Sequence, residues 1–310
     1  MSMRDWARRL GVGRALYRLR KMRRDGFVYT GRHWWASRRM ERAAMRLRPQ
    51  ALPELDLPGS VIYLTGRQHW FQTAFCLYSL QHQLGGSLPR VVFVSDGSLE
   101  GSATESLRRI FPASRVVGQA EVEGLIEEQF PPERFPVLRS VRRRYLHLRK
   151  VVDVGLADPG PGILLDSDML FHAPPAEILA WLKSPGAPLF MRDRQPSYGA
   201  DRELLEEICG APIPEPVNSG VVALDRGAVR WETVEHMLAR LVEKRDVNFY
   251  TEQALHAMMM APLGGRALDP ARYIVRPEGE VLAACSAPLH HYTWTSRLPY
   301  LEGKWRRFLT

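Results

Sequence analysis

Apolar runs and helix-like segments alternate after the first 60 residues, and this alternation limits the chain to few architectures. The runs at 61–64, 91–94 and 115–117 have the length and composition of buried strands. The segments at 70–84 and 101–110, which lie between these runs, have the composition of helices. Strands that alternate with helices predict an α/β fold with a mostly parallel sheet and helices on both faces.

A later apolar run leads into two acidic residues that could bind a ligand. Ile163-Leu164-Leu165 is followed by Asp166-Ser167-Asp168 and then by another apolar run. In an extended chain the two carboxylates point to one side, and a hard divalent cation that also binds phosphates is their natural partner. The alternative is an ordinary turn at a strand end, where aspartate is common.

Three further segments downstream have polar residues at the ends of predicted elements. A helix is expected over 139–156, and it contains Lys150. A buried strand over 217–224 begins with Asn218-Ser219-Gly220, and a helix that starts near Tyr250 carries Glu252-Gln253 in its first turn. Each of these has a structural alternative, namely a solvated lysine, a tight turn and a capped helix start.

The positive charge of the protein is concentrated at its N-terminus. Residues 1–50 hold 15 Lys/Arg and 3 Asp/Glu, a net charge of +12, so 51–310 carry −3 of the total of +9. We therefore divide the chain into a basic helical appendage, 1–50, with helices at about 3–24 and 34–48, and a main domain, 51–310. The second helix has an apolar stripe opposite its arginines.

Trp34 and Trp35 lead into this second helix, and basic charge with tryptophan suits an anionic membrane surface. A basic face packed on the body, or nucleic-acid binding through phosphates, is the alternative, and no nucleic-acid partner is expected. There is no apolar run long enough to span a membrane and no signal-peptide pattern. Cys76, Cys209 and Cys285 are predicted to be reduced core thiols of a cytoplasmic protein. If the appendage binds lipid, the protein would be peripheral at the inner membrane face.

The order of these motifs resembles that of the GT-A-fold glycosyltransferases, and most closely glycosyltransferase family 8 with its glycogenin-like members. Lys150 precedes Asp166 by sixteen residues, and Asn218-Ser219-Gly220, Glu252-Gln253 and a late histidine follow in turn. The resemblance covers roughly 60–310. It implies a Rossmann-like GT-A fold and transfer of a hexose from a nucleotide sugar, with UDP-glucose or UDP-galactose as the usual donors, and with retention of anomeric configuration.

The resemblance also implies a set of site residues. Asp166, Asp168 and His291, with His290 as the alternative to His291, would hold Mn²⁺ or Mg²⁺. Gln253, Glu252 and Asn218 would act at the sugar. The donor-binding residues would be Thr65, Gly66, Lys150, Asp166, Ser167, Asp168, Ser219, Gly220, Arg297 and Lys304.

The sequence departs from the family pattern at two positions. Glu252 stands where the family usually has aspartate, and Trp294 replaces a glycine of the closing motif. Arg297 and Lys304 are both candidates for the base that binds the diphosphate.

Two other functions compete with this one. A haloacid-dehalogenase-type phosphatase also uses two acids after an apolar strand, but its motif usually opens the domain, and here about 165 residues precede it. The other is an inactive GT-A scaffold that binds nucleotide without turnover. The acceptor is expected to be a glycan or a lipid-linked glycan.

Overall fold

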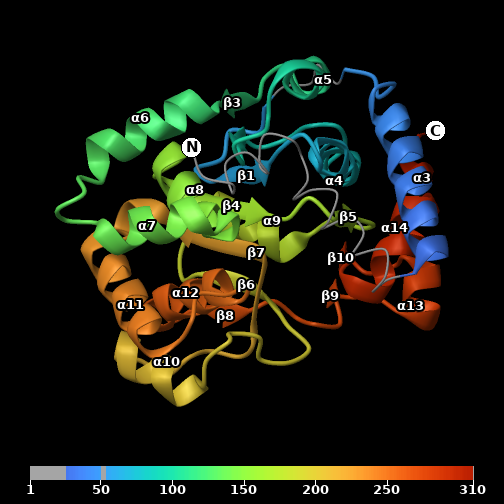
Figure 1. Cartoon of the computed structure of the whole chain (residues 1–310). Helices are drawn as coiled ribbons and strands as arrows, with labels where there is room; N and C mark the ends of the chain where they lie inside the picture. Colours follow the sequence, from blue (N-terminus) through green and yellow to red (C-terminus); the bar gives the residue numbers. More distant parts are fainter. Residues whose placement is uncertain (1–25, 50–53, 310) are drawn as a thin grey trace.

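The computed structural model describes residues 26–49 and 54–309. Its centre is a seven-stranded sheet in the order β3-β2-β1-β4-β7-β6-β8 (Figure 1). The strands of this sheet are β1 Ser60–Thr65, β2 Val91–Ser95, β3 Arg115–Val117, β4 Pro161–Leu165, β6 Leu189–Arg192, β7 Val217–Asp225 and β8 Arg266–Ala267.

Most neighbouring strands in this sheet are parallel. The pairs β1–β2, β2–β3, β1–β4 and β6–β8 are parallel, whereas β7 runs antiparallel to both β4 and β6. The carboxyl ends of β1, β2 and β4 therefore meet at one edge, and Asp166 follows directly after β4. The predicted α/β class and the mostly parallel sheet are confirmed.

A second, smaller sheet completes the region beyond that edge. It consists of β5 Met169–Phe171, β10 Leu289–His291 and β9 Tyr273–Val275, with β10 in the middle, antiparallel to β5 and parallel to β9. Because β4 ends at Leu165 and β5 begins at Met169, the acidic motif is the connection between the two sheets.

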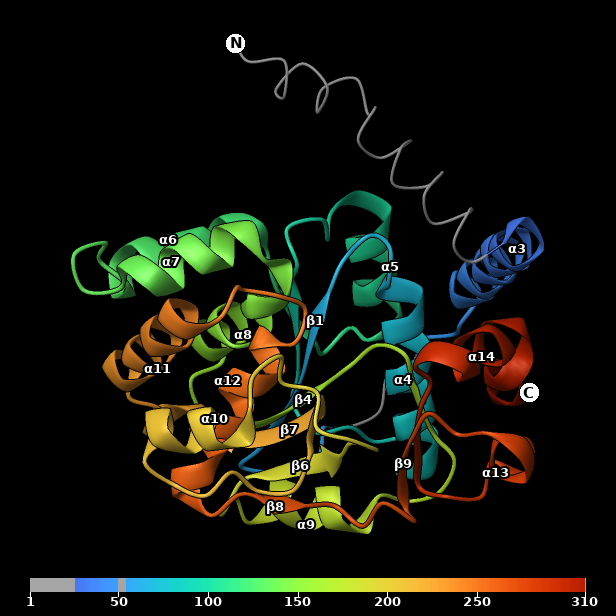
Figure 2. The same ribbon diagram turned by 60° about the horizontal axis from the view of Figure 1, so that its bottom comes forward.

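Helices cover both faces of the large sheet (Figures 1 and 2), and alternate residues of each strand face different cores. Val61 and Tyr63 pack in one core and Ile62 in the other. The first core takes side chains from α3 Phe27–Ala44, α4 Trp70–Gln83, α5 Gly101–Ile110, α9 Ala176–Lys183 and α14 Arg297–Gly303. The second takes them from α6 Gln119–Gln129, α7 Pro136–Arg144, α8 Val152–Ala157, α10 Arg202–Cys209, α11 Trp231–Lys244 and α12 Thr251–Met260.

The helix predicted at 34–48 corresponds to α3, which begins earlier, at Phe27, and ends earlier, at Ala44. It contacts α4 and α14, and Ala36, Met40 and Ala44 are buried against the body. The predicted apolar stripe is therefore part of the main core. The helix predicted at 3–24 lies outside the described residues, and the domain boundary at residue 50 stays a prediction.

The prediction of one helix over 139–156 is wrong. The segment is divided into α7, a 3-10 turn at Leu146–Lys150 and α8, because Tyr145 adopts an extended conformation with φ −125° and ψ 104°. The three cysteines are free, with Cys76 and Cys285 buried and Cys209 partly buried. Within the described ranges, no helix combines the length and the apolar character needed to cross a bilayer.

Candidate active site

The two aspartates after β4 are held in place by backbone hydrogen bonds from two other strands. The Asp166 N–H donates to the carbonyl of Gly220 in β7 at 2.8 Å. The carbonyl of Asp168 accepts from the N–H of Tyr292, just after β10, at 2.8 Å. Both sheets thus fix the same short connection, so their strands bring together residues that are far apart in the sequence.

His291 joins the two carboxylates from β10. Its Nε2 lies 3.2 Å from Oδ1 of Asp168 and 3.6 Å from Oδ2 of Asp166. Single oxygen or nitrogen atoms of these three residues all lie within 4.8 Å of one another. Two oxygens and one imidazole nitrogen form a donor set that suits Mn²⁺.

The hydrogen bonds of Asn218 decide which nitrogen of His291 carries a proton. Asn218 Nδ2 donates to Asp193 at 3.2 Å, so Oδ1 faces the other way and accepts from the Gly220 N–H at 3.0 Å. The same Oδ1 lies 3.0 Å from Nδ1 of His291, which must therefore be the protonated nitrogen. Nε2 is left facing the two carboxylates, and a metal-ligating histidine is commonly fixed in this way by its other nitrogen. The residues present therefore fit a divalent cation.

Gly220 leaves the space that His291 occupies. A Cβ at this position would lie 2.5 Å from both Cε1 and Nδ1 of His291 and 2.8 Å from Oδ1 of Asn218. Such distances are well inside van der Waals contact, so only glycine fits here without displacing the histidine.

Two cations flank the acidic pair. The Lys150 ammonium lies 2.5 Å from Oδ1 of Asp166, and the Arg297 guanidinium donates to Oδ2 of Asp168. Burial alone raises the pKa of Asp168, but the Arg297 guanidinium holds it well below its ordinary value. Burial alone lowers the pKa of Lys150, but Asp166 and Glu252 raise it above its ordinary value. Asp168 and Lys150 are therefore both charged at neutral pH.

Glu252 is buried at the start of α12 beside this group. One of its oxygens accepts from the Ser219 hydroxyl at 3.0 Å, and the other lies 2.8 Å from Nδ1 of His256, one helical turn later. Burial alone raises the pKa of Glu252, but Lys150, His256 and Ser219 lower it to about 2. Glu252 is thus a fixed carboxylate that holds Ser219 and stabilises Lys150.

This chain is similar to known proteins in fold but not in sequence. No protein-family model matches it, and no curated protein is significantly similar to it in sequence. Among solved structures, the galactosyltransferase LgtC in complex with donor and acceptor sugar analogues aligns with a TM-score of 0.54 at 12% identity, over 80% of this chain and 93% of that one. The bifunctional glycosyltransferase WbbM aligns with a TM-score of 0.51 at 11% identity, over 83% of this chain and 52% of that one.

The chain has the GT-A glycosyltransferase fold. The fold predicted from the order of the sequence motifs is confirmed. In this GT-A fold, the group of Asp166, Asp168 and His291 lies where the carboxyl end of β4 meets the small sheet. This is the kind of location at which α/β sheets bind ligands.

The structure separates the two neighbouring histidines of β10. His290 points away from the aspartates toward His172 and Cys285, which form a second group of potential ligands. The Tyr292 hydroxyl lies 2.7 Å from Nε2 of His172 and 3.4 Å from Nδ1 of His290, so a hydroxyl already occupies the middle of this group. Lys304 lies on this side too, where its charge lowers the pKa of His290, after the larger effect of burial. Of the two candidate bases, Arg297 is the one that contacts the acidic pair.

The residues expected to bind the nucleoside are linked to one another and to the end of β2. Thr65 and Ser167 are linked through Thr73, at 2.7 Å and 2.8 Å. Gly66 faces the carboxylate of Asp96, because a Cβ there would lie 2.0 Å from one of its oxygens. These contacts connect the ends of β1 and β2 to the middle of the acidic motif.

Gln253 faces a residue that sequence reasoning missed. Its Nε2 donates to the carbonyl of Ser197 at 3.0 Å and lies 3.4 Å from Oδ2 of Asp193. Asp193 follows β6 directly and also accepts from Asn218, so it connects two predicted site residues. The signal was an apolar run, 189–191, followed by polar residues and an acid.

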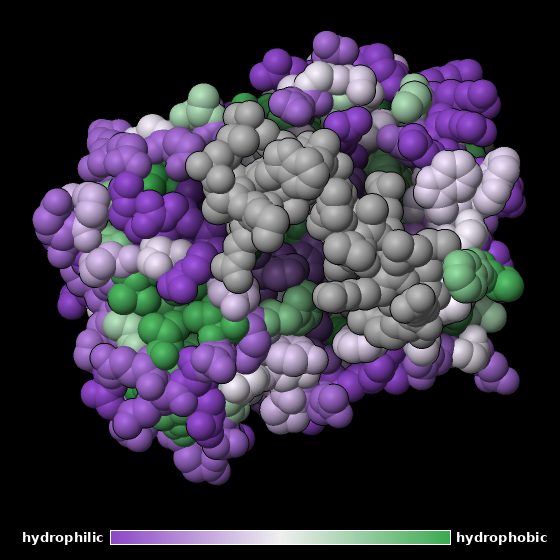
Figure 3. Space-filling model, in the orientation of Figure 1, coloured by the Kyte–Doolittle hydropathy of each residue, from purple (hydrophilic) through white to green (hydrophobic). Residues whose placement is uncertain are grey.

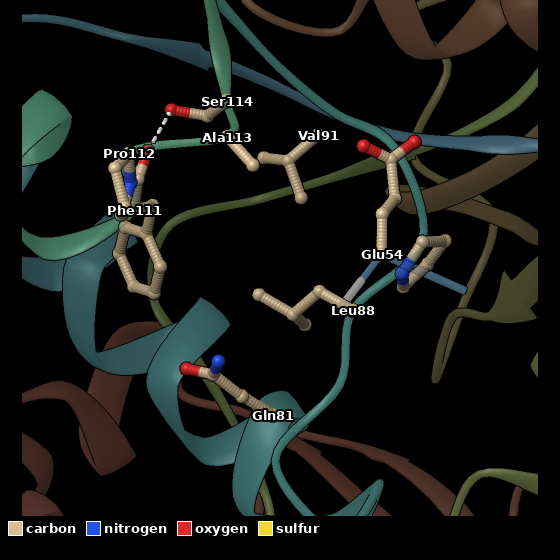
Figure 4. A pocket seen from close by; sticks show the side chains of 9 residues that line it. Glu54, Gln81, Leu88, Val91, Phe111, Pro112, Ala113 and Ser114 are labelled. Carbon is tan, nitrogen blue, oxygen red and sulfur yellow. Dashed lines mark hydrogen bonds between the residues drawn. The ribbon is translucent and has the colours of Figure 1, made fainter. Parts of the chain in front are cut away.

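Two cavities differ in what they offer a ligand. The first, of about 30 Å³, lies between Glu54, Gln81 and Phe111 (Figure 4) and has room for little more than a water molecule. Oε1 of Gln81 is buried there without a hydrogen-bond partner among the described residues. The second, of about 340 Å³, is lined by residues 195–201, Arg245 and Tyr250. It adjoins Ser197, to which Gln253 donates, and it is large enough for a sugar.

Proposed function

We propose that this protein is a metal-dependent glycosyltransferase that moves a hexose from a nucleotide sugar to a glycan or lipid-linked acceptor. The observation that carries the proposal is the group of Asp166, Asp168 and His291 in a GT-A fold, with Lys150 and Arg297 on either side. Mn²⁺ is the proposed ion, with Mg²⁺ as the alternative, because an imidazole nitrogen completes the ligand set.

The charges of the group support binding of a diphosphate together with the cation. Three carboxylates, Asp166, Asp168 and Glu252, face the two cations Lys150 and Arg297, so one negative charge of the protein is left unmatched. The charges of a divalent cation and of the diphosphate of a nucleotide sugar nearly cancel, and the two can enter together at little electrostatic cost. When bound, the cation would stabilise the negative charge that develops on the departing nucleoside diphosphate.

Lys150 and Arg297 are the side chains that would exchange an aspartate partner for phosphate oxygens. The Arg297 side chain is 44% exposed, so its guanidinium can turn toward a ligand without leaving the protein. The Lys150 side chain is only 15% exposed, and it would bind as a fixed charge. Thr65, Gly66 and Ser167 are proposed for the nucleoside side of the donor, and Ser219 and Gly220 for its sugar side.

Gln253, Asp193 and Asn218 form the polar surface on which the transferred sugar would lie. They are connected by the contacts of the Asp193 carboxylate, which fix the orientation of both amides. Glu252 has a pKa of about 2 and is therefore a poor proton donor or acceptor at neutral pH. We assign Glu252 a positioning role through Ser219 and Lys150, and we assign retention of configuration from the family resemblance.

A UDP-hexose, either UDP-glucose or UDP-galactose, is the proposed donor. Residues 1–50 are proposed to contact an anionic membrane surface, which would place the protein at the cytoplasmic face of the membrane and favours a lipid-linked acceptor. Two observations argue against the phosphatase alternative. The chain has a GT-A fold, and Arg297 binds the Asp168 carboxylate, which would serve as the acid–base in a phosphatase.

Thermal melting tests the donor site. The protein is heated with UDP, GDP or CDP, each with and without Mn²⁺, beside Asp168→Asn and the exposed control Asp56→Asn. UDP with Mn²⁺ at about 100 times its dissociation constant should stabilise the wild type and the control by about 2.7 kcal/mol, and Asp168→Asn much less. Absence of any nucleotide effect would refute the proposal, and binding without sugar transfer would favour the inactive scaffold.

A further inference from the structure

Helix α3 has two different faces, and the other described residues cover only one of them. Ala36, Met40 and Ala44 face the core, and Arg32 ties the helix to α14 through a bidentate ion pair with Glu302 at 2.8 Å and 2.9 Å. The stripe that the sequence offered for membrane contact is thus already used in folding. Any external partner must bind the opposite face.

That opposite face carries four large apolar side chains in the open. Phe27 is 68%, Val28 77%, Trp34 55% and Trp35 58% exposed. The spacing of seven residues between Phe27 and Trp34, and between Val28 and Trp35, places them on one side of the helix. In Figure 3, pale and green atoms lie at the right-hand edge, where Figure 1 shows α3, beside strongly hydrophilic ones. We call Phe27, Val28, Trp34 and Trp35 the outer face of α3.

Basic side chains continue the outer face toward the C-terminal end of the helix. Arg38, Arg39 and Arg42 are exposed, and the Arg38 guanidinium lies over the Trp34 ring at 5.8 Å. Glu41 is the sole acid of α3. The sequence before the helix adds nine Lys/Arg against two Asp over residues 1–25. A partner for this region must therefore be both apolar and negatively charged.

We propose that the outer face of α3 docks on an anionic phospholipid surface, with the two tryptophans at the level of the headgroups and the arginines on the lipid phosphates. Tryptophan and arginine on one side of a helix that lies in the interface plane are the composition of such anchors. A nucleic-acid duplex would be bound by the arginines alone, leaving four apolar side chains in water. The lipid surface uses both features.

The position of α3 gives this docking a consequence for the catalytic group. α14 begins at Arg297, whose guanidinium binds Asp168, and α3 packs directly on α14, with Arg32 bonded to Glu302. The outer face is therefore one helix away from the metal group. If the proposed transferase function holds, a membrane-bound molecule would present its site to acceptors anchored in the same bilayer.

Vesicle binding tests this proposal without nucleotide, so its outcome is independent of the transferase activity. The full chain is sedimented with vesicles of phosphatidylcholine alone and of phosphatidylcholine with about 30% phosphatidylglycerol. The wild type should bind the anionic vesicles only. Trp34→Ser with Trp35→Ser should weaken that binding at least about tenfold, because two interfacial indoles are lost. Arg38→Gln with Arg39→Gln should weaken it about fivefold per arginine.

The matched control is Leu263→Ser with Arg266→Gln, another exposed apolar and basic pair, beside β8 and across the molecule from α3 in both ribbon views. It should bind like the wild type. Thermal melting of each variant without lipid shows that the exposed substitutions leave the fold intact. Failure of the wild type to bind anionic vesicles, or full binding by the tryptophan variant, would overturn the proposal.

Discussion

Replacing Gly220 by alanine tests the catalytic geometry through a single methyl group. The new Cβ would meet His291 at 2.5 Å, whereas ordinary contact begins at 3.4 Å. Either the imidazole or β7 must therefore move by about 0.9 Å. β7 is buried, and the Gly220 carbonyl accepts from the Asp166 N–H, so moving the backbone would also displace the acidic motif and the imidazole is the group that yields.

Displacement of His291 removes its alignment with Asp166 and Asp168 and its hydrogen bond to Asn218. Loss of such an orienting bond typically weakens metal binding by 10- to 100-fold, so we expect a Mn²⁺ dissociation constant higher by about that factor. Titration of the purified protein with Mn²⁺, followed by electron paramagnetic resonance of the free ion, measures the change. Thermal stability should fall as well, by roughly 1–3 kcal/mol for overpacking.

Gly124→Ala is the matched control, because a Cβ at this position in α6 has open space within 4 Å. It should leave Mn²⁺ affinity unchanged and stabilise the helix by about 0.5–1 kcal/mol. If folded Gly220→Ala bound Mn²⁺ as tightly as the wild type, His291 would not be a ligand, and the deduction from the Asn218 hydrogen bonds would fail.

Three further predictions concern charge, pH and strain. Lys150→Met should destabilise the protein by about 3 kcal/mol in urea unfolding, because buried Glu252 loses its main cation, whereas exposed Lys183→Met should be neutral. Burial lowers the pKa of His172 to about 3, so between about pH 6.5 and pH 3 the unfolded chain binds this proton and the folded chain does not. The free energy of unfolding should therefore decrease as the pH is lowered through this window, and His172→Gln should reduce that slope near pH 5 by about 1.4 kcal/mol per pH unit. An unchanged slope would contradict this cause. Trp294 is 71% exposed and has φ 49°, a backbone conformation that is strained for tryptophan and not for glycine. Trp294→Gly should therefore raise the free energy of unfolding by up to about 1 kcal/mol, measured by calorimetry, and a lower value would show that contacts of the indole stabilise the fold.

The strands of the large sheet were predictable because each is a continuous apolar run. The same logic failed for 139–156, where an apolar stripe at helical spacing continues through Tyr145. The break there depends on contacts distant in sequence: Lys150 reaches Asp166, and Arg149 donates to the carbonyl of Asp96 at 2.7 Å. Local periodicity contains no information about such partners.

The ligand set was partly predictable for a related reason. Asp166 and Asp168 lie on one strand end, so their alternation follows from local geometry. The choice between His290 and His291 depends on how β10 pairs with β5, in which His291 lies opposite Met169 and His290 opposite Leu170. Asp193 was missed because its role requires β6 to lie beside β7, a pairing that no local pattern reports.

The contact between α3 and α14 also has a consequence for biosynthesis. Arg32 and Glu302 are 270 residues apart, so a ribosome that adds about 5–20 residues per second makes the second partner about 15–50 s after the first. Until then, α3 can pack on α4 but not on α14, so part of its apolar stripe stays uncovered. The packing of α3 is therefore completed only after α14 has been made, and a chain that terminates before α14 would leave part of that stripe open to aggregation.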